Sequence, residues 1–273
     1  MDLLRISRQF DPDLLELMDR PDPSRPELVR ALVNLQRLNQ HFGSHRTIRH
    51  FLKRWLKAGE KLSILDACTG FGDIPRLIVE WARQQGSQVK VLAMDMQPAT
   101  LDIARRRSDR FPEISYVQGD IRSFEPSQRF DLVLCSLALH HFGWPEAVEI
   151  LRRLKRLSER SVLVSDLERS FAGLLGVYVL TSTIFRNPMT KFDGRLSIRR
   201  AFSFEEMKRL AVEAGWAGFG HRRFLASHQA LWLERAENPF GIADSNSGVQ
   251  ELQEFRSSEG FASESTTAIL NLF

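Results

Sequence analysis

The chain has 273 residues, of which 43% are hydrophobic and 26% charged, a composition typical of a globular protein with one sizeable core. Its two cysteines, Cys68 and Cys135, are too few for a disulfide framework, and no Cys/His spacing indicates a zinc site. The formal charge is +4, but from Ala236 onward there are six acids and one base, so the remainder of the chain carries +9.

The N-terminus and the apolar stretches bear on location. Met1–Arg5 is not a basic segment followed by an apolar core, so we expect no secretion signal and a cytoplasmic location. The most apolar stretch, Phe171–Phe185, is shorter than the roughly 20 residues of a membrane helix, so any membrane contact would be peripheral. The basic body suits an acidic ligand or a membrane surface, but bases along helix faces are more simply explained as solvated.

Residues 1–60 predict an irregular lead-in and two amphipathic helices. Ser24 and Glu27 form a capping pattern at the start of the first helix, and Gly43 ends it. Ser44 can cap the second helix, and apolar residues recur at helical spacing in both. We expect this segment to pack on the following domain and to act as a helical lid or cap over a ligand.

From Leu62 onward, short apolar runs alternate with helical patterns. The predicted strands are Leu62–Asp66, Val89–Asp95, Ile114–Asp120, Phe130–Ser136 and Ser161–Leu167, and the predicted helices are Ile74–Gln84, Pro98–Asp109 and Trp144–Glu159. This alternation predicts an α/β fold with a doubly wound, mostly parallel sheet that has helices on both faces. The ligand site of such a sheet lies at the carboxyl ends of the strands.

The rest of the chain divides into three segments. Residues 171–200 are apolar and then basic, and we expect them to form an insertion on the substrate side. A helix opening at Ser203 and two closing strands, 219–224 and 228–233, complete a domain over residues 61–235. Residues 236–273 are rich in Ser, Glu, Gly and Asn and predict a flexible acidic tail.

Three predicted strands end at residues suited to a nucleoside ligand. Gly70 and Gly72 follow Asp66 and allow the backbone to approach a ligand closely. Asp95 ends the second strand, where a carboxylate can accept both hydroxyls of a ribose. Asp120 ends the third strand beside an apolar residue, which suits an adenine. The third glycine of a nicotinamide fingerprint is missing, and no Gly-Lys-Ser or Gly-Lys-Thr indicates a P-loop.

Four motifs in this order carry a resemblance. They are Asp66-Ala67-Cys68-Thr69-Gly70-Phe71-Gly72-Asp73, then Asp95, then Gly119-Asp120-Ile121, then Phe130-Asp131-Leu132-Val133-Leu134-Cys135-Ser136 with His140-His141-Phe142. Over residues 60–235 the chain resembles the class I S-adenosylmethionine-dependent methyltransferases, in particular the branch that methylates quinones and other small molecules. The resemblance implies a Rossmann-like seven-stranded sheet whose last strand is antiparallel.

The same resemblance implies a cofactor site for S-adenosylmethionine, which leaves as S-adenosylhomocysteine. The loop after the first strand would hold the methionine moiety, Asp95 the ribose, and Asp120 with Ile121 the adenine. The implied cofactor-binding residues are Asp66, Ala67, Cys68, Thr69, Gly70, Gly72, Asp95, Met96, Asp120, Ile121, Cys135 and Ser136. Cys68 replaces the first glycine of the family's loop, and no metal is expected.

Transfer to a hydroxyl group also requires that its proton be removed. His140 and His141 leave the fourth strand at the site, so one of them can act as the base, or both can shape the pocket. Asp166 is a weaker polar candidate. We expect an apolar or aromatic acceptor, a phenol, quinol or polyketide hydroxyl, with C-methylation as an alternative. The predicted substrate pocket includes Tyr178, Ile184, Phe185 and His41.

Two other functional classes remain open. The basic body and the arginine clusters 105–107, 152–153 and 222–223 would suit an RNA or protein methyltransferase, although we expect no nucleic-acid partner. A non-catalytic protein with the same fold is the second alternative. The intact acids and glycines of the cofactor motifs argue against it.

Overall fold

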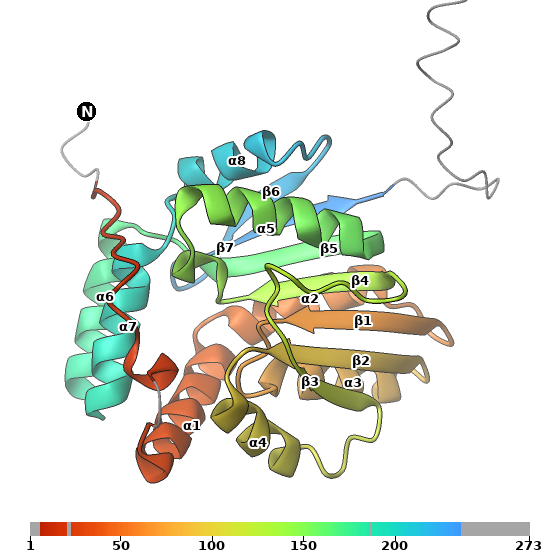
Figure 1. Ribbon diagram of the computed structural model, residues 1–273, viewed down its shortest axis with the longest axis horizontal. Coiled ribbons are helices and arrows are strands. Elements are labelled where there is room, and N and C mark those ends of the chain that lie inside the picture. Colours follow the sequence, from red (N-terminus) through yellow and green to blue (C-terminus); the bar gives the residue numbers. More distant parts are fainter. Residues whose placement is uncertain (1–5, 21–22, 186, 236–273) are drawn as a thin grey trace, which may run out of the picture. The chain divides into compact units, whose positions relative to one another are not determined.

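The computed structural model describes residues 6–20, 23–185 and 187–235, so the predicted tail lies outside the described residues. The architecture is a seven-stranded sheet in the order β3-β2-β1-β4-β5-β7-β6 (Figure 1). The strands are β1 (Lys61–Ala67), β2 (Gln88–Asp95), β3 (Ile114–Gln118), β4 (Phe130–Ser136), β5 (Ser158–Leu167), β6 (Gly220–Phe224) and β7 (His228–Glu234). All pairings are parallel except those of β7 with β5 and β6, which confirms the predicted fold class.

The strand β1 is an inner strand of the sheet and pairs with β2 on one side and the central strand β4 on the other. Its residues are buried because helices cover both faces, and this explains the continuous apolar run in the sequence. Ala67 lies opposite Met94 of β2 and Cys135 of β4. Successive strands are added on one side of β1 up to β3 and on its other side from β4 onward. The strand order thus reverses between β1 and β4, and α/β sheets open a crevice for ligands at such a point.

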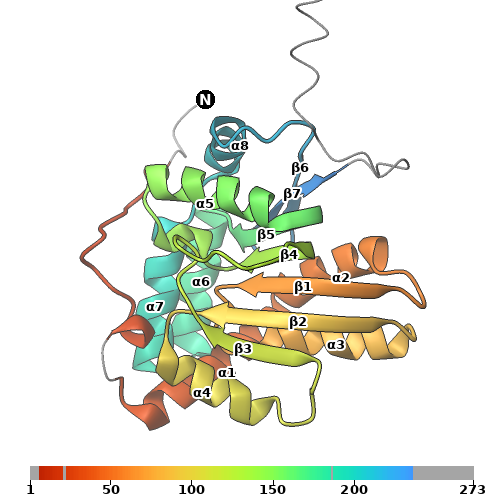
Figure 2. The ribbon, with the colours of Figure 1, turned by 45° about the vertical axis from the view of Figure 1, so that its right-hand side comes forward.

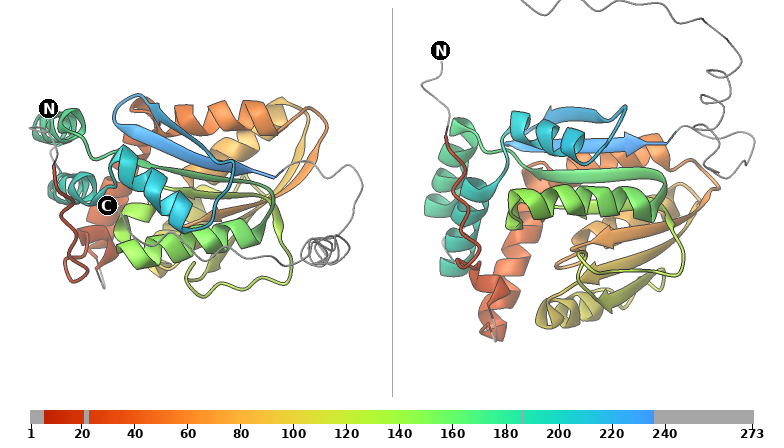
Figure 3. Two further views of the ribbon diagram at one scale, coloured as in Figure 1. Left: turned by 90° about the horizontal axis from the view of Figure 1, so that it is seen from above. Right: turned by 45° about the horizontal axis from the view of Figure 1, so that its top comes forward.

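Helices form a layer on each face of the sheet (Figure 3). The helices are α1 (Arg25–His41), α2 (Ser44–Trp55), α3 (Asp73–Gln84), α4 (Pro98–Arg107), α5 (Trp144–Leu157), α6 (Phe171–Thr183), α7 (Pro188–Arg200) and α8 (Phe204–Glu213). The apolar sides of α2 and α3 share one buried cluster with β1 and β2, and those of α5 and α8 share another with β4 and β5. The helix α2 is thus part of the sheet packing and more than a cover.

Only some of the predicted helix caps are present in the structure. Ser203 and Glu206 form the capping box predicted for α8. Ser24, in contrast, makes no side-chain cap at α1, so that expectation is wrong; the helix starts with Pro26 in its first turn instead. Gly43 adopts a φ of 121°, a backbone conformation that favours glycine, and this lets the chain turn directly from α1 into α2.

The stretch 171–200 folds into a helix pair, α6 and α7, that lies beyond the carboxyl ends of the strands (Figure 2). The two helices pack on each other, and α7 also contacts α1. Within the described residues, no helix is long and apolar enough to cross a membrane. The helices α1, α6 and α7 therefore surround the edge of the sheet where the predicted site residues end their strands.

Candidate active site

The loop after β1 is shaped by backbone conformations that favour glycine. Gly70 and Gly72 have φ angles of 51° and 70°. A Cβ atom on Gly72 would lie 2.2 Å from the Tyr116 hydroxyl oxygen, so only glycine fits there. Cys68, which replaces the family's first glycine, keeps the left-handed conformation with a φ of 59°. The loop therefore closes in spite of the substitution.

Cys68 of this loop lies beside Cys135 of β4. Their hydrogen bond, together with burial, raises the pKa of the Cys68 thiol. Both cysteines are free, and Cys135 is fully buried. A thiol held protonated is a poor nucleophile, so the pair acts as small apolar filling.

A buried carboxyl group, that of Asp66, and a half-buried one, that of Asp95, face the space above the loop. Asp66 is 1% exposed and accepts a hydrogen bond of 2.6 Å from the Thr69 hydroxyl; burial raises its pKa to about 7. Asp95 accepts hydrogen bonds from the backbone N–H groups of Gly70 and Gln97, at 2.7 and 2.9 Å. Burial also raises the pKa of Asp95, against these hydrogen bonds. The site thus holds two desolvated acids that a cationic or hydroxylated ligand would stabilise.

At the far end of the space, Asp120 follows β3 and has a partner of its own. The guanidinium of Arg122 hydrogen-bonds to both carboxylate oxygens of Asp120, and this lowers the pKa of Asp120. Ile121 is buried beside it, whereas Met96 is half exposed. An adenine at this end would share Asp120 with Arg122, which the sequence motif does not indicate.

These residues line a cavity of about 440 Å³ at the carboxyl ends of β1, β2 and β4. The predicted site residues that line it are Asp66, Cys68, Thr69, Gly70, Asp95, Met96, Asp120, Ile121, Ser136 and His141. Ala67, Gly72 and Cys135 do not line it. Ala67 ends β1, Gly72 precedes α3, and Cys135 lies in β4. Several residues between 10 and 19 also line the cavity, although no site residue was predicted in that segment.

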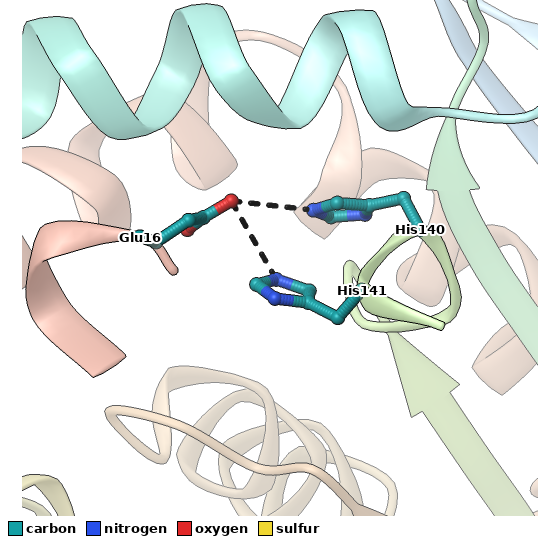
Figure 4. Close-up of side chains that lie close together, drawn as sticks. All are labelled: Glu16, His140 and His141. Carbon is teal, nitrogen blue, oxygen red and sulfur yellow. Dashed lines mark ion pairs between the residues drawn. The ribbon is translucent and has the colours of Figure 1, made fainter. Parts of the chain in front are cut away.

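Glu16, His140 and His141 point toward one another at one wall of this cavity (Figure 4). The distances from Glu16 Oε1 to Nε2 of His140 and of His141 are 3.9 and 3.7 Å. Glu16 is 3% exposed, and burial raises its pKa to about 7. Ser197 donates a hydrogen bond of 2.6 Å to the same carboxylate oxygen.

His140 is held in one orientation by Asp166. Its Nδ1 lies 2.7 Å from Asp166 Oδ1, and its backbone N–H donates to Oδ2 at 2.9 Å. Burial opposes the charge of Asp166, but His140 and the hydrogen bonds outweigh it, so the pKa of Asp166 is lowered. Since an ionised carboxylate accepts the Nδ1 proton, the Nε2 atom of a neutral His140 carries the lone pair. That Nε2 atom is buried without a hydrogen-bond partner among the described residues.

The spacing of the three side chains lies between that of metal ligands and that of groups bound to one oxygen atom. Metal bonds of about 2.1 Å place tetrahedral ligands roughly 3.4 Å apart, closer than the observed 3.7 and 3.9 Å. Hydrogen bonds of about 2.8 Å to one hydroxyl oxygen place tetrahedrally arranged partners roughly 4.6 Å apart, farther than observed. Either occupant would therefore require small movements of these side chains.

A second cavity of about 230 Å³ adjoins the first one. Glu16, Leu35, Asn39 and His141 line both cavities. The second cavity continues between α1, α6 and α7, and its walls are largely apolar. The helix α6 contributes Ala172, Gly173, Gly176, Val177, Leu180 and Thr181 to it.

The predicted substrate residues lie elsewhere. Tyr178, Ile184, Phe185 and His41 line neither of these two cavities, although α6 itself does. Ile184 is 64% exposed and Phe185 is buried away from both cavities. Within the predicted stretch 171–200, the residues that line the second cavity are therefore different from the predicted ones.

Sequence reasoning missed the groups that close the site. Asp193 of α7 accepts hydrogen bonds from the backbone N–H groups of Leu17 and Met18, at 2.6 and 3.2 Å, and so holds Glu16 in place. Asn39 and His45 both bond to Asp73 Oδ2, at 3.0 and 2.8 Å. Acids and amides inside otherwise apolar helical patterns were the available signal for these contacts.

Comparisons with known proteins agree with this geometry. Residues 64–160 match the family described as "Methyltransferase domain". A 2-phytyl-1,4-naphtoquinone methyltransferase of Thermosynechococcus vestitus is 41% identical over 86 residues, which cover 31% of this chain and 37% of that protein. The protein of the same name from Synechococcus elongatus is 27% identical over 140 residues, 49% of this chain and 58% of that protein. The chain thus matches about a third to three fifths of the length of these relatives.

Solved structures share the fold. The plantazolicin methyltransferase BpumL in complex with SAH has a TM-score of 0.60 at 12% identity, over 81% of this chain and 93% of that one. The magnesium protoporphyrin IX methyltransferase of Synechocystis with bound SAH has a TM-score of 0.51 at 15% identity, over 81% and 91%. Together with the family match and the strand order, they confirm the class I methyltransferase fold.

Proposed function

Because residues 64–160 match a methyltransferase domain, we propose that the protein transfers the methyl group of S-adenosylmethionine to a hydroxyl group of a small aromatic acceptor with an apolar part. The observation that carries this proposal is the junction of the two cavities. There, Glu16, His140 and His141 place their polar atoms within 4.8 Å of one another, where a hydroxyl oxygen can reach all three after small side-chain movements. The larger cavity suits the cofactor, and the smaller apolar cavity suits the rest of the acceptor.

The chain's residues fit the cofactor. The carboxyl group of Asp66 is buried with a hydroxyl partner and pairs with no cation of the described part of the chain, which suits the ammonium group of the methionine moiety. Asp95 would accept the ribose hydroxyls, and a Cβ atom on Gly70 would meet open space, so the loop leaves room for the ligand. Met96, Asp120 and Ile121 would contact the adenine. When bound, S-adenosylmethionine supplies a methyl group already activated on a sulfonium.

The hydroxyl group that receives the methyl group needs a base to remove its proton and contacts that fix its orientation. We assign the base to His140, because Asp166 fixes its Nδ1 proton and leaves Nε2 facing the second cavity. Glu16 and His141 orient the hydroxyl from the other side. The hydroxyl proton passes to His140 Nε2, and it later leaves for water when the site opens. Holding the oxygen in line with the methyl carbon, with water excluded, accounts for much of the expected rate.

The alternatives have weaker support. Each of the arginine clusters that suggested RNA has a member in an ion pair with an acid of the domain: Arg106 with Asp102, Arg153 with Glu125, and Arg223 with Glu168. Such pairs are typical of a solvated surface and leave less free charge for phosphates. The relatives named for quinone methylation support a small-molecule acceptor.

The test uses methyl-labelled S-adenosylmethionine with phenols and quinols that carry alkyl chains of increasing length. We expect label in an organic-extractable ether and a preference for acceptors with a chain. Gly176→Leu fills the second cavity, since a Cβ atom there meets nothing within 4 Å. It should lower kcat/KM for long-chain acceptors roughly a hundredfold and spare short ones.

The matched control is Leu175→Ala on the exposed side of the same helix. Leucine in place of glycine favours a helix by about 1 kcal/mol, so a loss of activity in Gly176→Leu would not reflect unfolding. Label found only in RNA or protein would overturn the proposal. Equal chain-length preference in Gly176→Leu and the native protein would refute the assignment of the second cavity.

A further inference from the structure

The outer face of α6 is apolar and exposed. It consists of Phe171, Leu175 and Val179, which are 57%, 56% and 51% exposed. These three are spaced by four residues, so they form one continuous stripe. Single exposed apolar residues are ordinary, but a stripe along an uncharged helix indicates a surface that something covers.

The neighbouring helix, α7, supplies positive charge, and its one acid is buried. Lys191 and Arg199 are exposed on α7, and Arg195 is half-buried there. Among the described residues none of the three is in an ion pair; the Arg195 and Arg199 guanidinium groups lie 4.3 and 5.5 Å from the Tyr178 ring centre. The acid of this helix pair, Asp193, is 2% exposed and faces the N-terminal segment. An apolar stripe beside unpaired bases is complementary to an anionic, apolar partner.

The opposite side of α6 lines the second cavity. Gly173, Gly176, Val177 and Leu180 face that cavity, so the outer face and the cavity are separated by the thickness of one helix. The helix pair lies at one end of the domain, beyond the carboxyl ends of the strands (Figures 1 and 3). A helix that lies in the plane of a membrane surface buries such an apolar face at the boundary between headgroups and acyl chains.

We propose that the outer face of α6, with the bases of α7, docks the domain on an anionic lipid surface. The apolar stripe lies among the acyl chains nearest the headgroups, and Lys191, Arg195 and Arg199 pair with lipid phosphates. As an extension that rests on the proposed function, an acceptor dissolved in the lipid enters the second cavity past α6. The docking itself does not depend on methyl transfer.

The test measures binding of the full chain to vesicles by co-sedimentation. Vesicles of phosphatidylcholine with phosphatidylglycerol are compared with vesicles of phosphatidylcholine alone. We expect binding to the anionic vesicles, lowered roughly tenfold in Leu175→Glu. Lys191→Gln should lower binding roughly fivefold and reduce its salt dependence. The matched control is Val212→Glu on α8, where an equally exposed valine (61%) lies outside the helix pair, and it should bind as the native chain does.

Three results would overturn the docking proposal. The first is equal loss of binding in Leu175→Glu and Val212→Glu, and the second is no preference for anionic vesicles. The third is a concentration-dependent dimer that Leu175→Glu abolishes, with no vesicle binding, which would show that a second copy covers α6. Methylation of a short-chain phenol in detergent separates the two proposals. If the native chain binds vesicles but does not methylate, the proposed function fails and the docking surface stands.

Discussion

The affinity for S-adenosylhomocysteine should rise with pH, because Asp66 must lose a proton to pair with the ligand's ammonium group. Burial raises the pKa of Asp66 to about 7 in the free protein. If only the ionised form binds, the apparent Kd is about 11 times its limiting value at pH 6 and about 1.1 times at pH 8. We therefore expect roughly tenfold tighter binding at pH 8 than at pH 6.

In the ligand-free protein, the contribution of Asp66 to the free energy of unfolding changes with pH in the opposite direction to the ligand affinity. A carboxyl group whose pKa is raised on folding contributes its full stability below its unfolded pKa near 4, and this contribution is lost as the pH rises through 7. Asp73 and Asp95 act in the same direction because their charges also raise the pKa of Asp66. The free protein should lose stability over the range in which ligand affinity increases.

Isothermal titration calorimetry in two buffers of different ionisation enthalpy measures both the Kd and the protons released. We expect close to one proton released at pH 6 and almost none at pH 8. Asp66→Asn should remove the pH dependence and weaken binding at pH 8 by about 1.5–3 kcal/mol. The control is Asp131→Asn at the opposite end of β4, where the carboxylate bonds to Ser63; it should keep the native pH dependence. A native Kd that is flat or that falls toward pH 6 would refute this assignment of Asp66.

Three further predictions follow from the site and its loop. Asp166→Asn should lower kcat roughly 10²–10⁴-fold, and more acidic phenols should recover part of the loss, whereas a purely structural role for His140 would make the loss independent of phenol acidity. Gly72→Ala should lower the free energy of unfolding, measured in urea, by about 2 kcal/mol or more. Adding Tyr116→Phe should restore part of this stability, because it removes the hydroxyl oxygen that would lie 2.2 Å from the new Cβ atom. No recovery in the double variant would contradict that clash. Removal of divalent metal with EDTA should leave methyl transfer unchanged, and activity restored only by an added metal ion would show that the Glu16 cluster binds one.

Local patterns were enough to bring most of the predicted cofactor residues to one cavity. Asp66, Gly70 and Asp95 lie at strand ends, and parallel strands bring such ends to one edge of the sheet whatever the side-chain packing. The strands and most helices of residues 61–235 were predicted because burial on both faces produces short apolar runs that the sequence displays. The helices α6 and α7 were not predicted. Cys68, at the position of the family's first glycine, adopts a left-handed conformation with a φ of 59°.

The second cavity was decided by tertiary contacts. Glu16 reaches His140 from a lead-in without regular periodicity, and Asp193 of α7 holds that lead-in through its backbone. The helix α6 is uncharged and apolar around its circumference, so no polar stripe indicates which residues face inward, and Val177 rather than Tyr178 lines the cavity. The sequence by itself determined the sheet and the glycine-containing loop after β1, because those depend on local periodicity. Only the folded chain decided the second cavity and the Glu16 cluster, because they depend on contacts between segments far apart in the sequence.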